Sequence, residues 1–214
     1  MKAILFDFDG VVADTMKYHA DSWVLAFQRH GMDLSAGVVY ENEGAPFAVI
    51  IKTLFRNCEA AYDEKIAVEI IKTKEEIYKA YDHNNRIYPE VYEILTLAEK
   101  LGLKKGLVTG TSRQNLHQTI PEELLSRFEV VITADMVKKG KPFPDPYLKA
   151  ASLLNVSPKD CTVIENAPLG IEAAKGAGCK CIGICTTLTR KHLSKADVIV
   201  ANHRDLLAEF SIAS

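Results

Sequence analysis

The chain has 214 residues, of which 48% are hydrophobic, and its formal net charge at pH 7 is -2. This length and composition allow one well-buried core and a smaller second lobe. The small net charge gives no electrostatic basis for binding nucleic acid or an anionic membrane, and no apolar run has the length of a transmembrane helix. We therefore expect a cytoplasmic protein, a monomer or weak homodimer, that acts on a small molecule.

Six apolar, β-rich runs punctuate the chain, and helical patterns separate most of them. This alternation predicts βαβ units and an α/β fold with a doubly wound, Rossmann-like parallel sheet. Ligands of such folds bind beyond the carboxyl ends of the strands. The predicted strands cover residues 2–8, 105–109, 130–133, 162–165, 181–184 and 198–200.

The alternation is interrupted between the first and second predicted strands by a stretch with helical patterns throughout. Each of its helices has an apolar stripe to bury, which favours a separate bundle. We expect residues 15–85 to form an inserted all-α helical cap domain, and residues 1–14 and 86–214 to form the α/β catalytic core. The polar residues 82–86 are the expected return linker. Apolar stripes run through Met16, Ala20, Trp23, Val24 and Phe27, and through Ile66, Ile70, Ile77 and Tyr81.

Four of the five cysteines fall in apolar, strand-like stretches. They lack the paired Cys-x2-Cys spacing and the neighbouring histidines that are typical of a zinc site. We interpret them as buried thiols. They are Cys161, Cys179, Cys181 and Cys185.

Two aspartates follow the first predicted strand, in the segment Asp7-Phe8-Asp9-Gly10. Residues two apart share one face of a strand, so these carboxylates would repel each other unless the chain turns or a cation lies between them. Gly10 permits the turn, and a divalent metal would stabilise the carboxylates. An Asx-type turn that closes a strand would use the same residues.

Reactive side chains follow two further strands, at residues 109–112 and at Glu165 and Asn166, and Lys141 lies in a loop between them. Because the ends of parallel strands share one edge of a sheet, we expect these segments to converge with the two aspartates. One carboxylate can attack phosphorus and another can transfer protons, while hydroxyl and backbone N–H groups hold phosphoryl oxygens. A lysine neutralises developing charge. The set predicts a phosphate site.

Four segments of the chain match, in order, the motifs of the haloacid dehalogenase superfamily. The chain resembles the beta-phosphoglucomutase and phosphoglycolate phosphatase branch, in which a helical cap follows the first motif, and the resemblance covers nearly the whole length. The matching segments are Asp7-Phe8-Asp9-Gly10-Val11, Val108-Thr109-Gly110, Gly140-Lys141-Pro142 and Val163-Ile164-Glu165-Asn166.

The resemblance implies a role for each matched residue. Asp7 would be the nucleophile that forms an aspartyl-phosphate. Asp9 would act as the general acid for the leaving group and then as the general base for water. Thr109 and the Gly110 N–H would bind the transferring phosphoryl group, and Lys141 would pair with the phosphate and with Asp7.

The resemblance also implies Mg2+ as the cofactor, with Asp7, the Asp9 backbone carbonyl, Glu165 and Asn166 as its ligands. Asn166 departs from the aspartate of the related beta-phosphoglucomutases, and its amide oxygen would ligate Mg2+ without a negative charge. Asn166 could instead be only the N-cap of the helix that Pro168 opens. We expect weaker Mg2+ binding than an aspartate would give and a larger contribution from Glu165.

Besides Gly110, four residues are candidates for binding the substrate: Thr111, Arg113, His19 and Trp23. His19 and Trp23 are four apart and share a helix face. Their segment resembles the first cap helix of beta-phosphoglucomutases, in which the matching histidine couples cap closure to the general acid. His19 could equally be an ordinary hinge residue, and Arg113 could be a surface residue.

Asp9 favours phosphoryl transfer, because haloacid dehalogenases and phosphonatases lack an acid at its position. Phe47 lies where we align the arginine that grips the second phosphate in a mutase, although Lys52 or Arg56 could substitute for it. We therefore expect a Mg2+-dependent phosphatase for a small phosphorylated metabolite, such as a sugar or polyol phosphate. A beta-phosphoglucomutase-type mutase is the alternative. A catalytically weak phosphometabolite-binding protein is a third hypothesis, based on Asn166.

Overall fold

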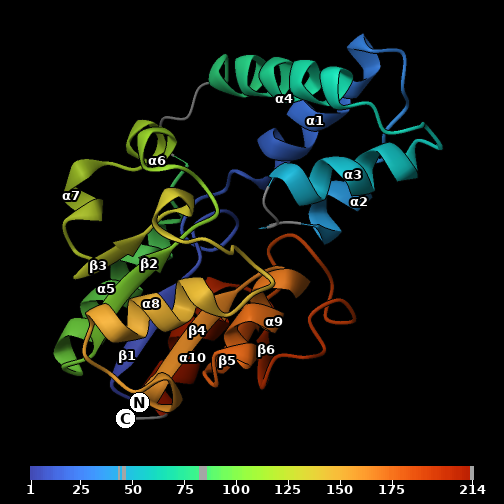
Figure 1. The fold of residues 1–214 in the computed structure, drawn as a ribbon. Coiled ribbons are helices and arrows are strands. Elements are labelled where there is room, and N and C mark those ends of the chain that lie inside the picture. The colour runs from blue at the N-terminus through green and yellow to red at the C-terminus, as the bar shows by residue number, and fades with distance from the viewer. Residues whose placement is uncertain (43, 45–46, 82–85, 213–214) are drawn as a thin grey trace.

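A six-stranded, fully parallel sheet forms the centre of the computed structural model, which describes residues 1–42, 44, 47–81 and 86–212. The strand order is β3-β2-β1-β4-β5-β6 (Figure 1). The chain adds β2 and β3 on one side of β1 and then β4, β5 and β6 on its other side. The expected doubly wound sheet is confirmed. The strands are β1 (Ala3–Phe6), β2 (Lys104–Val108), β3 (Val130–Ile132), β4 (Cys161–Glu165), β5 (Lys180–Ile184) and β6 (Val198–Val200).

Helices cover both faces of the sheet, because its central strands are apolar on both sides. In β1, Ile4 and Phe6 belong to one apolar cluster, and Ala3 and Leu5 belong to the other. This double burial is typical of parallel sheets. The first cluster is covered by α5 (Pro89–Lys100), α6 (Arg113–Thr119), α7 (Glu122–Leu125) and α10 (His203–Ile212), and the second by α8 (Asp145–Leu153) and α9 (Pro168–Gly176). Short 3-10 turns occur at Ala134–Met136 and Pro158–Asp160.

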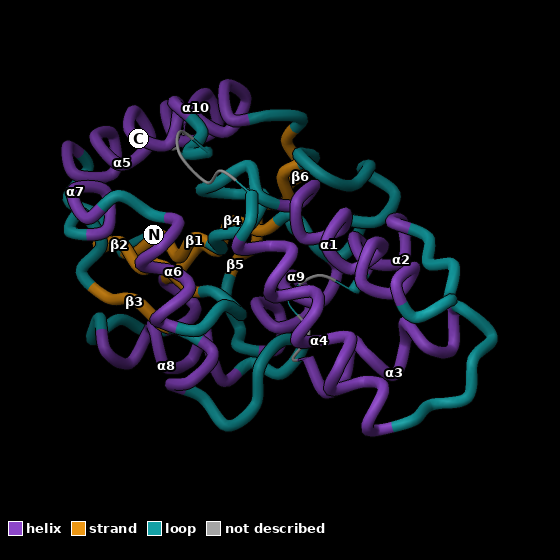
Figure 2. Tube along the Cα trace, turned by 90° about the horizontal axis from the view of Figure 1, so that it is seen from above, coloured by secondary structure: helices purple, strands orange, loops and turns teal. Residues whose placement is uncertain are grey.

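Four helices lie together beyond the carboxyl edge of the sheet, and we call them the cap helices (Figures 1 and 2). They pack around an apolar cluster of their own, in which the Phe27 and Phe55 rings meet edge to face at 5.5 Å. No helix in the described part of the chain is long and apolar enough to cross a membrane. The cap helices are α1 (Met16–Arg29), α2 (Ala36–Glu41), α3 (Phe47–Asn57) and α4 (Glu64–Lys79).

The two chain segments that join the cap helices to the core run side by side. The Asp14 N–H donates to the Arg86 carbonyl at 2.7 Å, and Ala13 and Ile87 form an antiparallel bridge. The cap helices are therefore tethered through one short paired ribbon. Residues 82–85 of the expected return linker lie outside the described residues.

Three of the four cysteines that we interpreted as buried thiols are buried, and Cys185 is not. All five are free, and Cys161, Cys179 and Cys181 are fully buried near the amino ends of β4 and β5. Cys185 is partly buried.

Candidate active site

A tight loop after β1 separates the two aspartates of the first motif. The Phe8 carbonyl accepts from the N–H groups of Val12 and Ala13, and Gly10 adopts a positive φ of 84°. A Cβ on Gly10 would lie 2.1 Å from Asn166 Nδ2, so this position combines a turn with a close approach that only glycine allows. The loop leaves both Asp7 and Asp9 buried at the carboxyl edge of the sheet.

Asp7 belongs to a buried cluster of charged side chains. Lys141 Nζ donates to Asp7 Oδ1 at 2.5 Å and to Glu165 Oε1 at 2.6 Å, and all three side chains are almost completely buried. The Tyr147 hydroxyl donates to the same Glu165 oxygen at 2.8 Å. One lysine from the loop before α8 thus joins the ends of β1 and β4.

Both carboxylate oxygens of Glu165 already accept two hydrogen bonds each from groups of the protein. Its Oε1 accepts from Lys141 and Tyr147, and its Oε2 accepts from the backbone N–H groups of Asn166 and Ala167. These bonds use the roughly four acceptor sites of an ionised carboxylate. A Cβ on Gly170 would lie 1.7 Å from Glu165 Oε1, so the carboxylate rests directly on the backbone of α9. In this geometry Glu165 positions Lys141 and has no acceptor site left for the metal that we expected it to bind.

Burial and an excess of negative charge in the cluster raise the proton affinity of Asp7. Burial raises the pKa of Asp7 to about 8, with a further contribution from the Glu165 charge that outweighs the attraction of Lys141. The pKa of Lys141 is raised, because the two carboxylates outweigh its burial. Without a further cation, the site therefore retains a proton on Asp7 near neutral pH.

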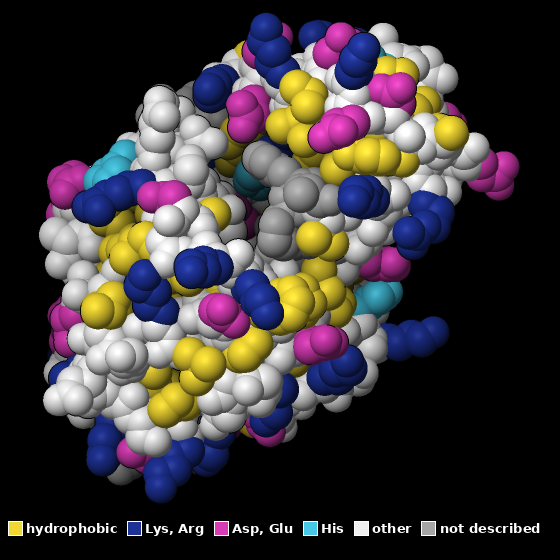
Figure 3. All heavy atoms as spheres, in the orientation of Figure 1, with side chains coloured by type: hydrophobic (Ala, Val, Ile, Leu, Met, Phe, Trp, Pro, Cys, Tyr) yellow, Lys and Arg dark blue, Asp and Glu magenta, His cyan; other side chains and the backbone are white. Residues whose placement is uncertain are grey.

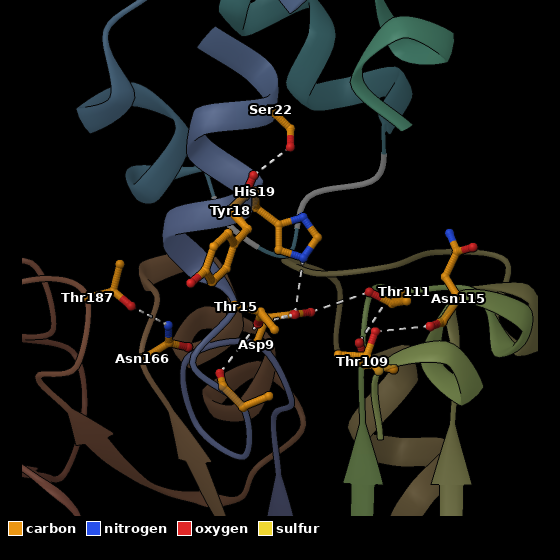
Figure 4. Close-up of polar contacts among 12 residues, drawn as sticks. Asp9, Thr15, Tyr18, His19, Ser22, Thr109, Thr111, Asn115, Asn166 and Thr187 are labelled. Carbon is orange, nitrogen blue, oxygen red and sulfur yellow. Dashed lines mark hydrogen bonds and ion pairs between the residues drawn. The ribbon is translucent and has the colours of Figure 1, made fainter. Parts of the chain in front are cut away.

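Asp9 accepts three hydrogen bonds in the next layer of the site (Figure 4). Thr15 Oγ1 donates to Oδ1 at 2.6 Å, and His19 Nε2 lies 3.2 Å from the same oxygen. Thr111 Oγ1 donates to Oδ2 at 3.3 Å. Burial alone would raise the pKa of Asp9, but the contacts with His19 and Thr15 and the nearby charge of Lys74 hold it below its usual value.

His19 connects Asp9 to a second buried lysine in the cap helices. Lys74 Nζ lies 3.2 Å from His19 Nδ1, and the His19 ring stacks on Tyr78 at 4.2 Å. An ammonium group can only donate, so Nδ1 is the acceptor and the neutral ring donates its Nε2–H to Asp9. Lys74 also lies 5.7 Å from the centre of the Trp23 ring. Two cap helices, α1 and α4, therefore act together on the acid/base candidate.

A cavity of about 450 Å³ lies between the cap helices and the core, and the face in Figure 3 is hollowed there. Five expected site residues line it: Asp9, His19, Trp23, Gly110 and Thr111. The Asp7 cluster lies outside this lining. Arg113, which we expected to bind substrate, does not line the cavity; it is exposed, and its backbone N–H donates to Asp135.

The loop after β2 provides the expected hydroxyl and backbone groups. Thr109 is buried, and its Oγ1 accepts from the Thr111 N–H at 3.0 Å. Gly44 from the cap segment lies against this loop, since a Cβ on Gly110 would be 3.5 Å from the Gly44 carbonyl oxygen. A Cβ on Gly44 would in turn lie 2.9 Å from Lys141 Cδ. The cap is therefore closed over the strand ends in this structure.

Asn166 supplies an observation that bears on the expected metal. Its Nδ2 donates to Thr187 Oγ1 at 3.0 Å, whereas its Oδ1 is buried without a hydrogen-bond partner. A buried, unpaired carbonyl oxygen is costly unless a ligand satisfies it. An unpaired oxygen of this kind suits a hard cation such as Mg2+, which prefers oxygen ligands. Ala167, not Asn166, is the N-cap of α9, so the capping alternative is wrong.

The oxygen atoms that could bind such a metal carry unusually little negative charge. Among the described residues, no group of three or more His, Cys, Asp or Glu side chains is arranged to hold a metal ion. A Mg2+ at this position would draw on neutral oxygens as well as on one carboxylate, in keeping with the preference of this ion for oxygen ligands.

Several residues of the site were not among the sequence candidates. Lys74 lies on the buried stripe of α4, between Ile70 and Tyr78 at spacings of four, where a lysine interrupts the apolar pattern. That interruption was a usable signal. Thr15, Tyr147 and Thr187 carried no comparable signal, because a hydroxyl gives little indication of its partner before the fold is known.

The doubly wound sheet, the inserted helical cap and the buried Asp–Lys–Glu cluster define a capped α/β enzyme. The haloacid dehalogenase-like hydrolase family model matches residues 4–184, and the chain belongs to this family.

Relatives of known name agree with this assignment. The chain is 30% identical over 202 residues to validoxylamine A 7'-phosphate phosphatase of Streptomyces hygroscopicus subsp. limoneus, covering 93% of this chain and 92% of that protein. It is 28% identical to hexitol phosphatase A of Escherichia coli, covering 93% and 90%. The solved beta-phosphoglucomutase of Clostridium difficile has a TM-score of 0.80 at 25% identity, covering 100% and 96%. The protein is a phosphoric monoester hydrolase, as expected.

The raised pKa of Asp7 predicts a pH-dependent stability of the metal-free protein. Between about pH 4 and 8 the unfolded chain has lost the Asp7 proton and the folded chain has kept it, so this group lowers stability as the pH rises. Asp7→Asn removes that loss. We compare the melting temperatures of Asp7→Asn and the parent in the presence of a chelator. We expect the variant's advantage over the parent to be larger at about pH 8.5 than at about pH 5, by on the order of 3 °C or more.

The matched control is Asp33→Asn, which alters an exposed aspartate in the cap. It should follow the parent at both pH values. An Asp7→Asn variant that also follows the parent at both values would contradict a protonated Asp7.

Proposed function

We propose that this protein is a Mg2+-dependent phosphatase that hydrolyses a small phosphomonoester, a sugar or polyol phosphate, through an aspartyl-phosphate on Asp7. The observation that carries the proposal is the buried Asp7–Lys141–Glu165 cluster directly behind a capped cavity that Asp9 lines. One relative is named as a phosphatase of validoxylamine A 7'-phosphate, and another as a hexitol phosphatase. The third hypothesis, a protein that only binds a phosphometabolite, is not favoured, because the nucleophile and its lysine are both in place.

In the first half-reaction, a carboxylate oxygen of Asp7 attacks phosphorus and the bond from phosphorus to the leaving oxygen breaks. Lys141, fixed by Glu165 and Tyr147, offsets the charge of the incoming phosphoryl group. Asp9 gives its proton to the leaving oxygen. An anionic phosphoryl group beside Asp9 favours the protonated carboxyl that this step needs.

In the second half-reaction, Asp9 removes a proton from water and the resulting hydroxide attacks the aspartyl-phosphate. The bond between phosphorus and Asp7 breaks, which releases phosphate and restores the nucleophile. Asp9 is suited to this role because its contacts with His19 and Thr15 favour the ionised form. Thr109 and the N–H of Gly110 are proposed to hold the phosphoryl oxygens in both steps.

The proposed Mg2+ would be held by the Asp7 carboxylate, the Asp9 carbonyl and Asn166 Oδ1. Such an ion polarises the phosphoryl group and offsets the negative charge that Lys141 leaves unbalanced. The neutral Asn166 in this set should make its binding weak.

A phosphosugar mutase is the second candidate function. Its support is the link from Lys74 through His19 to Asp9, which ties the cap to the acid/base, and the likeness to the Clostridium difficile mutase. We rank it lower because Phe47, at the start of α3, replaces the expected arginine; the Phe47 side chain lies outside the described residues.

The central test is hydrolysis of 4-nitrophenyl phosphate with and without Mg2+. We expect the parent to turn over only with Mg2+, and Asp7→Asn to lose at least about a thousandfold in turnover because no carboxylate remains to attack. Asp33→Asn should match the parent. Turnover that survives the loss of the Asp7 carboxylate would exclude the proposed mechanism.

A separate experiment tests the metal ligand at residue 166. Asn166→Asp adds a negative charge beside the proposed ion, so we expect the Mg2+ concentration for half-maximal thermal stabilisation to fall by about tenfold. Asn57→Asp adds the same charge at an exposed position of the cap and should leave that concentration unchanged. If Asn166→Asp also left it unchanged, direct ligation by residue 166 would be wrong.

A further inference from the structure

Three polar side chains line the cavity without a partner in the described part of the chain: Glu75 of α4, and Asn115 and Gln118 of α6. The hydrogen bonds of Asn115 use its backbone groups only. Figure 4 shows its side-chain amide pointing toward the cap helices. Polar groups that line a pocket without internal partners are suited to binding a polar ligand.

These side chains come from opposite sides of the cavity. Glu75 follows Lys74 on the cap side, and Asn115 and Gln118 lie on the core side, one turn apart in α6. Closure of the cap therefore places a carboxylate acceptor opposite two amides, each of which both donates and accepts. Hydroxyl groups on neighbouring carbons of a ligand satisfy such a set, because each hydroxyl also donates and accepts.

The charges around this part of the cavity disfavour a second phosphate. Among the described residues, Asp9, Glu75 and Asp135 contribute three carboxylates to the lining, against the two ammonium groups of Lys74 and Lys79. Lys74 is buried against His19 near Asp9, whereas Lys79 is exposed. An anionic leaving group would meet net negative charge in a partly enclosed space, where repulsion is stronger than in water.

The geometry points to Glu75, Asn115 and Gln118 as a subsite that binds the hydroxyls of an uncharged, polyhydroxylated leaving group and selects against a second phosphate. This inference rests on the proposed phosphatase function and adds to it the residues that recognise the leaving group of the substrate. The remaining wall, with Trp23, Val39 and Ile50, offers apolar contact to the carbon chain.

The test compares two esters that differ in the leaving group, namely sorbitol 6-phosphate and 4-nitrophenyl phosphate. We expect Glu75→Ala and Asn115→Ala to lower kcat/KM for sorbitol 6-phosphate by about tenfold or more, because hydroxyl groups lose their partners. The same variants should hydrolyse 4-nitrophenyl phosphate within about twofold of the parent. Matched controls are Glu76→Ala and Gln114→Ala, which alter the exposed neighbours outside the cavity lining and should affect neither ester.

The possible failures are distinct. Equal losses on both esters, or no loss on sorbitol 6-phosphate, would overturn the subsite. Hydrolysis of the aryl ester by the parent without any preference for sorbitol 6-phosphate would also overturn it and leave the phosphatase function intact. If the parent hydrolysed neither ester with Mg2+, the proposed function itself would fail.

A second comparison tests the charge selection. The parent should hydrolyse fructose 6-phosphate faster than fructose 1,6-bisphosphate at equal concentration. Glu75→Gln removes the charge and keeps the hydrogen-bonding shape, so we expect it to reduce this preference by about tenfold. An unchanged preference in Glu75→Gln would show that Glu75 does not exclude the second phosphate.

Discussion

The ammonium of Lys141, buried between Asp7 and Glu165, is the interaction on which the rest of the site depends. Removing one partner from a buried ion pair leaves an uncompensated charge, which costs roughly 3–5 kcal/mol of stability. One ammonium cannot balance two carboxylates, however. Burial and the remaining negative charge together raise the pKa of Asp7, and the same charge would favour a cation at this end of the sheet.

The two lobes contribute different chemistry to one cavity. The core holds Asp7, Lys141 and the loop that begins at Thr109, which we propose as the nucleophile, its lysine and the phosphoryl-binding loop, near the ends of β1, β2 and β4. The cap brings His19 against Asp9, places Lys74 against His19 and presents Glu75 to the cavity. A change in the cap can therefore alter the substrate without disturbing the groups that attack phosphorus.

The sequence predicted the core of the fold well, because strand periodicity and strand ends are local signals. Asp7, Thr109 and Lys141 could be assigned before the structure, since parallel strands must bring their ends to one edge. Glu165 was assigned to the site but not to its contacts, because four donors from distant segments meet there only after folding. Arg113 was a candidate for binding the substrate with a surface position as its alternative, and it is exposed, whereas Asn115 of α6 lines the cavity.

The paired linkers determine how much freedom the cap can have. Because Asp14 and Arg86 are bonded to each other, both ends of the cap leave the core at one point, and this paired ribbon is the natural axis for any rotation of the cap. Thr15 lies beside that axis and His19 lies one helical turn farther out, so a rotation would separate His19 from Asp9 before it separated Thr15. The angle of the cap would then set the proton affinity of a single carboxylate.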